Sequence, residues 1–186
     1  MEQKNSMQSL ILKFGAILGV VSIIIHLINY SFGDVYYQFK SESLKADGKV
    51  MNIIIGLLGL LAMIFIIVYA IKAFKNSNGG FLSLGQGVKI GLGIALISAI
   101  IGVIYNFIFI NVIEPGFFAK GYEFMEQALI EKYPDMPEEQ LEMSLNMAKK
   151  FASPVGSSLM SLVMSLFLGL IISLIGGAVL KKNEQL

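Results

Sequence analysis

The sequence predicts an all-α integral membrane protein with four transmembrane helices, and three observations carry this prediction. The chain of 186 residues is 55% hydrophobic and only 15% charged, whereas soluble domains are about 45–50% apolar and about 25% charged. Four apolar runs are long enough to cross a hydrocarbon core, which takes roughly 20 helical residues. These runs are continuous, unlike the alternating strands of transmembrane barrels. We therefore interpret residues 1–186 as a single four-span membrane domain.

The four expected spans cover, in order, residues 10–30, 50–71, 88–113 and 159–180. The lysines within them, Lys13 and Lys89, lie near a span end, from which the side chain reaches the headgroups. A cleaved signal peptide is the alternative for the first span. Its length and the polar His26 and Asn29 argue against cleavage, because signal peptides have an apolar core of about 7–15 residues.

The placement of lysines orients the spans, because cytoplasmic loops of membrane proteins are enriched in basic residues. Lysines divide evenly between the two sides. However, the loop from Lys72 to Lys89 has no acid, and Lys181 and Lys182 directly follow the fourth span, whereas acids accompany the lysines of the opposite loops. We therefore expect both termini in the cytoplasm. The inverted topology remains open, because acids count little in this rule.

The loop of residues 114–154 is expected to form an amphipathic helical hairpin on the extracytoplasmic side. Apolar residues recur at helical spacing before Pro134, namely at Phe118, Tyr122, Met125 and Leu129. A second helix is expected to begin near Asp135, and its apolar face would hold Leu141, Leu145, Ala148 and Phe151 or Ala152. This hairpin either caps the bundle or serves as a surface for a partner or for ligand gating.

Small residues are expected to bring the spans into close contact. Every fourth residue from 153 to 177 is Ser or Gly. Such residues let helix backbones approach closely in a membrane. The expected packing positions are Gly15 and Gly19 in the first span, Gly87 and Gly91 in the third, and Ser161, Ser165, Gly169, Ser173 and Gly177 in the fourth. The alternative is a pore lined by serine hydroxyls.

A polar cluster is expected near the outer ends of the first and third spans. It would combine His26 and Asn29 with Asn106 and Glu114, and Asn52 at the start of the second span is a further candidate. Ionisable residues at membrane depth are functional hypotheses by default. Such a cluster would bind a proton, a cation or a small ligand. The alternative is a neutral histidine that hydrogen-bonds to a neighbouring helix.

Motifs for catalysis, cofactors and metals are missing from the sequence. There is no Cys, and His26 is the sole histidine, so thiol nucleophiles, paired-histidine metal motifs and thiolate sites are excluded. The GxSxG, GxGxxG and Walker patterns do not occur. The net charge of +1 argues against a nucleic-acid partner. We therefore expect no enzyme and no cofactor.

Several segments resemble a known family. They are Phe14–Gly19, Ile71–Lys75, Asn78–Gly91, Tyr105–Phe109 and Glu114–Phe117. Together they are similar to the domain of unknown function 4199 family, small four-span membrane proteins common in one phylum of Gram-negative bacteria. This family has no established activity. The resemblance therefore implies a four-span topology and a bacterial inner-membrane location, and no site residues.

Two function classes follow from the sequence. The first is a non-enzymatic structural or accessory subunit that acts through helix–helix contacts with itself or with a larger membrane complex. The second is a small solute or ion transporter or channel that uses the polar cluster near the outer face. In both cases the lipid bilayer is the surrounding medium.

Overall fold

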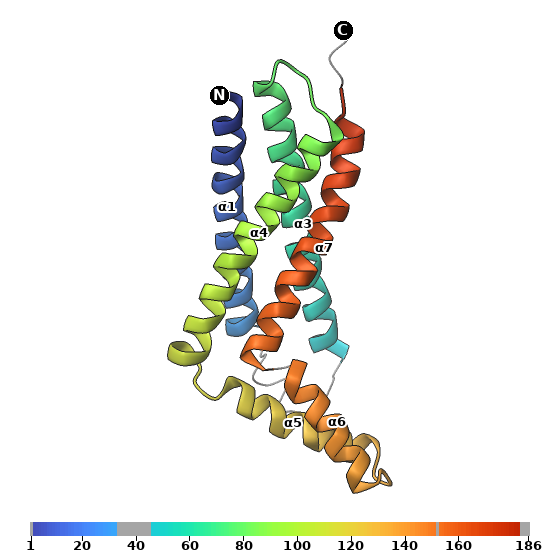
Figure 1. Cartoon of the computed structure of the whole chain (residues 1–186). Coiled ribbons are helices and arrows are strands. Elements are labelled where there is room, and N and C mark those ends of the chain that lie inside the picture. The colour runs from blue at the N-terminus through green and yellow to red at the C-terminus, as the bar shows by residue number, and fades with distance from the viewer. Residues whose placement is uncertain (1, 33–45, 152, 183–186) are drawn as a thin grey trace.

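The computed structural model describes residues 2–32, 46–151 and 153–182, which are almost entirely helical (Figure 1). The long helices are α1 (Glu2–Phe32), α3 (Ala46–Ser77), α4 (Leu84–Ile108) and α7 (Pro154–Leu180). A π-helical turn, η1 (Phe109–Ile113), extends α4, and α5 (Phe117–Lys132) and α6 (Glu138–Phe151) form a hairpin before α7. The long helices contain four candidate membrane spans: Met7–Tyr30, Ile53–Ser77, Leu84–Ile113 and Pro154–Leu180. The expected fold class is confirmed: the chain is an all-α, multi-pass membrane protein.

The third and fourth spans begin earlier in the chain than expected, because a capping residue precedes each of them. The third span begins at Leu84, because Ser83 accepts a hydrogen bond from the Gln86 amide and Gln86 accepts one from the Ser83 amide, which forms a capping box. The fourth begins at Pro154, because Ser153 caps the helix and proline suits its first position.

A tight turn connects α3 and α4, as the Asn–Gly-rich sequence predicts. Gly79 and Gly80 have φ angles of 64° and 85°, in the left-handed region that glycine adopts without penalty. After this turn, Leu82 and Lys182 exchange backbone hydrogen bonds of 2.9 and 3.0 Å. These bonds tie the turn to the segment that follows α7, at the end of the bundle where Figure 1 places both termini.

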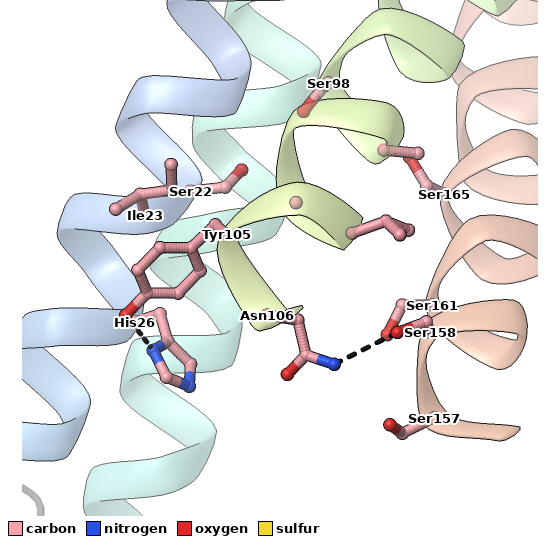
Figure 2. Close-up of a pocket in the computed structure, with 13 residues that line it drawn as sticks. Ser22, Ile23, His26, Ser98, Tyr105, Asn106, Ser157, Ser158, Ser161 and Ser165 are labelled. Atoms are coloured by element: carbon pink, nitrogen blue, oxygen red, sulfur yellow. Dashed lines mark hydrogen bonds between the residues drawn. The ribbon is translucent and has the colours of Figure 1, made fainter. Parts of the chain in front are cut away.

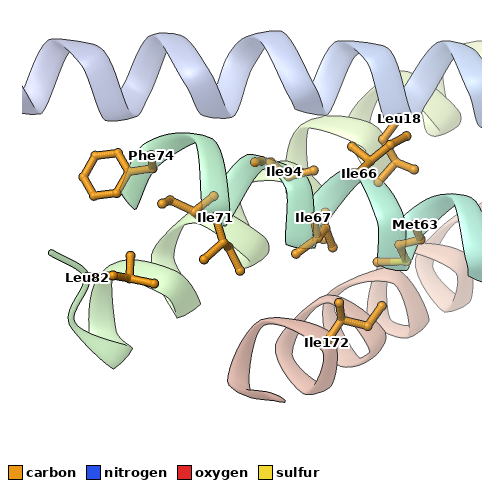
Figure 3. Close-up of a cluster of buried hydrophobic side chains, with 12 residues drawn as sticks. Leu18, Met63, Ile66, Ile67, Ile71, Phe74, Leu82, Ile94 and Ile172 are labelled. Atoms are coloured by element: carbon orange, nitrogen blue, oxygen red, sulfur yellow. The ribbon is translucent and has the colours of Figure 1, made fainter. Parts of the chain in front are cut away.

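The hydrophobic core lies in the half of the bundle nearest the termini, which we call the inner half (Figure 3). Helix α4 is central and packs most extensively against α7 and α1. One face of α3 is fully buried here, through Ile67, Ala70, Ile71 and Phe74. Apolar side chains of α1, α4 and α7 complete the core.

Small residues in the inner half mark close approaches of helix backbones. A Cβ atom added to Gly87 would lie 2.9 Å from the Cα of Gly177, and one added to Gly169 would lie 2.6 Å from the Cβ of Ala95. A Cβ on Gly91 would collide with Ser173. Helices α4 and α7 therefore interlock through small residues within one chain. Helix α1 also approaches α4 closely at small residues, namely Gly15 and Gly19.

The half of the bundle farther from the termini, the outer half, is packed loosely. Gly56 and Gly59 in α3 and Gly102 in α4 have no atom within 4 Å of an added Cβ. Large apolar side chains near the start of α3, such as Ile53 and Leu57, are exposed on the helix surface. The four spans are therefore packed more closely in the inner half than in the outer half.

Helices α5 and α6 form the expected hairpin at the outer end of the bundle (Figure 1). Leu145 is buried, and the expected apolar residues of α5 are half-buried. Two details differ from the sequence prediction. Helix α6 begins at Glu138, after Pro137, rather than near Asp135. Phe151 is exposed rather than part of the packed face, and Ala152 lies outside the described residues.

Candidate functional site

Two neighbouring cavities occupy the loosely packed outer half of the bundle. The first, of about 370 Å³, lies between α1, α4 and α7, and most of the 13 residues that line it are polar (Figure 2). The second, of about 520 Å³, extends from α1 toward α3. Both cavities are lined by Ser22, His26, Ser98 and Ser165. We therefore treat them as one polar site with two lobes, the α7 lobe and the α3 lobe.

The α3 lobe has an apolar floor and an unpaired polar group in its wall. Leu18 and Met63, both members of the hydrophobic core, line its inner end. Asn29 lines the same lobe, and its Oδ1 atom is buried with no hydrogen-bond partner in the described part of the chain. A buried polar atom without a partner costs roughly 1–3 kcal/mol. Because this atom has almost no accessible surface, a ligand in the lobe would reach it only after the Asn29 side chain turns.

His26 joins the two lobes and is held in place by α4. Its Nδ1 atom lies 2.9 Å from the hydroxyl of Tyr105. Its ring also meets the rings of Tyr105 and Phe109 edge-on, with centroids 5.4 and 5.0 Å apart. These contacts orient the imidazole at the junction of the two lobes.

Phe109 is the centre of an aromatic cluster that supports His26 from outside the cavity. Its side chain is only 1% exposed, and its ring contacts those of His26, Tyr30, Tyr105 and Phe117, with centroids between 5.0 and 6.0 Å apart. Phe109 begins the π-helical turn η1, and π-helical turns occur frequently at functional sites. The aromatic cluster thus joins α1, α4 and the start of α5.

Asn106 lies in the wall of the α7 lobe and connects α4 to α7. Its Nδ2 atom donates a 3.0 Å hydrogen bond to Oγ of Ser158 (Figure 2). Closer to the interlocked half, Oγ of Ser165 donates a 3.3 Å bond to the carbonyl of Ala95. These two bonds are the polar links between the helices where their small-residue contact ends.

Glu114 lines neither lobe, although the sequence analysis grouped it with the other three polar residues. It follows the π-helical turn and accepts hydrogen bonds from Lys120 Nζ at 2.6 Å and from the Tyr30 hydroxyl at 2.8 Å. The bond from Lys120, and then that from Tyr30, lowers the pKa of the Glu114 carboxyl. Glu114 therefore secures the junction of α1 with α5, while His26, Asn29 and Asn106 line the site.

The small-residue ladder of α7 has two different roles along its length. Gly169, Ser173 and Gly177 pack against α4 in the inner half. Ser161 and Ser165 instead line the α7 lobe in the outer half. The inner part of the ladder therefore makes helix contacts, and its outer part lines a cavity.

Ser22 and Ser98 line both lobes, and the sequence analysis did not select them. One signal was present in the sequence. Ser22, His26 and Asn29 are spaced by four and three residues, so they share one face of a helix. Ser98 carried no comparable signal, because it is an isolated hydroxyl in an apolar span. The further candidate Asn52 has a side chain outside the described residues.

Hydroxyl, amide and imidazole groups supply the polar part of the site, and apolar atoms make up the larger part of its lining. No Asp, Glu, Lys or Arg lines either lobe among the described residues. The described residues also contain no group of His, Asp or Glu side chains that could hold a metal ion. Because a charged ligand in a membrane needs an opposite charge or extensive solvation, this lining suits an uncharged polar ligand.

Comparison with known proteins gives a family and no function. No curated protein and no solved structure matches the chain. The family described as "Protein of unknown function (DUF4199)" matches residues 13–182. This match covers all four spans and the hairpin. The chain therefore belongs to the DUF4199 family, as the resemblance in its sequence motifs implied.

Proposed function

We propose that the protein binds a small uncharged polar molecule, or the uncharged polar part of a larger one, in the two-lobed site of its outer half. The observation that carries this proposal is the concentration of hydroxyl, amide and imidazole groups around a loosely packed space inside a membrane domain. Polar groups at membrane depth are costly unless they bond to a partner.

The closed inner half favours a binding site over a straight pore. Leu18 and Met63 floor the α3 lobe, and the interlocked glycines of α4 and α7 lie beyond the α7 lobe. A pore in this arrangement would require the interlocked half to separate. We therefore assign the chain a binding role, in which transport would need a second conformation.

Thermal unfolding of the detergent-purified protein tests this proposal. A panel of uncharged polyols and amides is compared with organic acids and amines of the same size. A ligand at 100 times its Kd stabilises a protein by about 2.7 kcal/mol, so the unfolding temperature should rise with uncharged compounds only. Ser98→Ala should weaken this rise, whereas Ser77→Ala, at the far end of α3, should not. No rise with any uncharged compound would refute the proposal.

An accessory role in a larger membrane complex is the second candidate. The observation that favours it is an apolar stripe on α6 outside the spans, where Met143, Met147 and Phe151 are each about 60% exposed and spaced by four residues. Affinity purification from the native membrane in a gentle detergent tests this role. A stoichiometric membrane partner that is lost in Met147→Gln would support it, and recovery of the chain alone would contradict it.

We also propose that the chain lies in a bacterial inner membrane with both termini in the cytoplasm. Lys13 lies in the first half of α1, Lys72 and Lys75 near the end of α3, and Lys89 near the start of α4. Lys181 and Lys182 directly follow α7. These basic residues close to the span ends support the proposed orientation, because the positive-inside rule gives most weight to such positions.

A further inference from the structure

A third cavity, of about 490 Å³, forms a groove on the outer surface between α4 and the start of α7. Most of its lining is apolar and includes Phe107, Val155 and Leu159. These three side chains are exposed and lie within the membrane spans, so the groove faces the acyl chains of the bilayer. We call it the lipid-facing groove.

The lipid-facing groove and the polar site share one wall. Val103, Asn106 and Ser158 line both the groove and the α7 lobe. The 3.0 Å hydrogen bond between the Asn106 amide and the Ser158 hydroxyl therefore crosses the boundary between them. The lipid-facing groove and the α7 lobe thus adjoin each other along these three residues, with this neutral hydrogen bond in the wall between them.

We infer that the natural ligand of the polar site is an amphiphile with one aliphatic chain and an uncharged head that carries hydroxyl or amide groups. This inference rests on the proposed function and specifies its ligand. The aliphatic chain lies in the lipid-facing groove, and the head passes between Asn106 and Ser158 into the polar site. The head reaches its site from within the membrane.

The energetics of the wall suit such a ligand. A neutral hydrogen bond contributes only about 0.5–1.5 kcal/mol net. When the bond between Asn106 and Ser158 opens, hydroxyl groups of the ligand head form hydrogen bonds with both side chains in its place. The interlocked Gly91 and Gly169 hold α4 and α7 together in the inner half, so separation is confined to the outer half. A charged head is disfavoured, because the site supplies no opposite charge among the described residues.

Photo-crosslinking with a monoacylglycerol that carries a diazirine in its chain tests this inference. The full chain is reconstituted in lipid nanodiscs and irradiated, and the labelled residues are mapped by mass spectrometry. We expect labels at Phe107, Val155 or Leu159 that are removed by excess unlabelled monoacylglycerol. The fatty-acid anion of the same length should not remove them, because its head is charged.

Two glycine variants of α4 separate specific binding from contact with bulk lipid. Gly102 lines the α7 lobe, and a Cβ atom added there meets no atom within 4 Å. Gly102→Leu therefore fills the lobe and should reduce the competed labelling at least tenfold. Gly85→Leu is the matched control, because Gly85 is equally open but lies at the other end of the same helix, and its labelling should match the parent protein.

The outcomes distinguish the inference from the proposed function. Labelling that competitor does not remove, or that Gly102→Leu leaves unchanged, would identify ordinary lipid contact and overturn the inference. Stabilisation by an uncharged polyol that Ser98→Ala weakens, without competed chain labelling, would retain the proposed function and overturn the amphiphile. Failure of both measurements would overturn both. If Gly102→Leu does not fold, Ser161→Leu, which also fills the α7 lobe, takes its place with the same expected loss.

Discussion

Phe109 is the residue on which the outer end of the bundle depends most directly. Its ring contacts side chains from α1, α4 and α5, and it is almost completely buried in a half of the molecule where few side chains are. Aromatic pairs in this geometry contribute about 0.5–1.5 kcal/mol beyond the burial of their area. Loss of this ring would therefore leave His26 without the contact that fixes its imidazole.

We expect Phe109→Ala to destabilise the protein by about 3 kcal/mol or more, because the substitution opens a cavity in a buried cluster. Phe107→Ala is the control, since Phe107 is two residues away and 68% exposed. Unfolding of both variants in the same detergent gives the comparison. Equal losses of stability would show that the aromatic cluster does not support the fold.

The Glu114 carboxylate makes stability depend on pH in a defined direction. Lys120 and Tyr30 lower its pKa in the folded state. The stabilisation is therefore present above the pKa of the unfolded chain and is lost as pH falls through the folded pKa. We expect Glu114→Gln to lower the unfolding temperature at pH 7 by on the order of 2 °C, since partly exposed pairs contribute little. This difference should vanish at acid pH, and a difference that grows with acid would contradict the assignment.

The surroundings of helices α4 and α7 differ between the inner and outer halves of the bundle. Their inner halves meet through small residues, and their outer halves diverge around a polar site. The packing positions Gly87, Gly91, Gly169, Ser173 and Gly177 could be predicted, because their four-residue spacing is a sequence property. The point of divergence could not be predicted, because it depends on which neighbour each small residue meets.

The same substitution at two glycines of α4 tests this division. Gly91→Ile should destabilise the protein by about 3 kcal/mol, because the new side chain collides with Ser173 and separates two helices. Gly102→Ile should cost far less, since it enters open space. Thermal unfolding in detergent compares the two. A Gly102 variant as unstable as the Gly91 variant would show that the outer half is as tightly packed as the inner half.

At the scale of the whole molecule, four spans require that the α3–α4 turn and the hairpin lie on opposite sides of the membrane. The chain has no cysteine, so single-cysteine variants report position without background. We expect a membrane-impermeant maleimide to label Asp135→Cys on intact spheroplasts, and Asn76→Cys only after lysis. The reverse pattern would establish the inverted topology, and labelling of both on intact spheroplasts would contradict the single span between them.

The sequence predicted the whole fold better than it predicted the site. Composition and the length of the apolar runs determine the number of spans, and Gly79 and Gly80 determine the turn between two of them. The grouping of His26 with Asn29 and Asn106 followed from their similar expected depth in the membrane. The same criterion placed Glu114 in the group. It could not show that the extra residue of the π-helical turn and the position of Lys120 direct the Glu114 carboxylate away from the site.

The π-helical turn gives the outer end of α4 room for one residue more than an α-helix would hold. The amide of Glu114 bonds to the carbonyl of Phe109, five residues earlier, at 2.8 Å. In an α-helix the amide bonds to the carbonyl of the fourth residue before it. Removal of one residue between Phe109 and Glu114, such as Ile110, would therefore convert the turn to α-helix while the same amide and carbonyl stay bonded. A single-residue deletion here should be tolerated far better than one in the α-helical part of α4, where every residue that follows would rotate by about 100°.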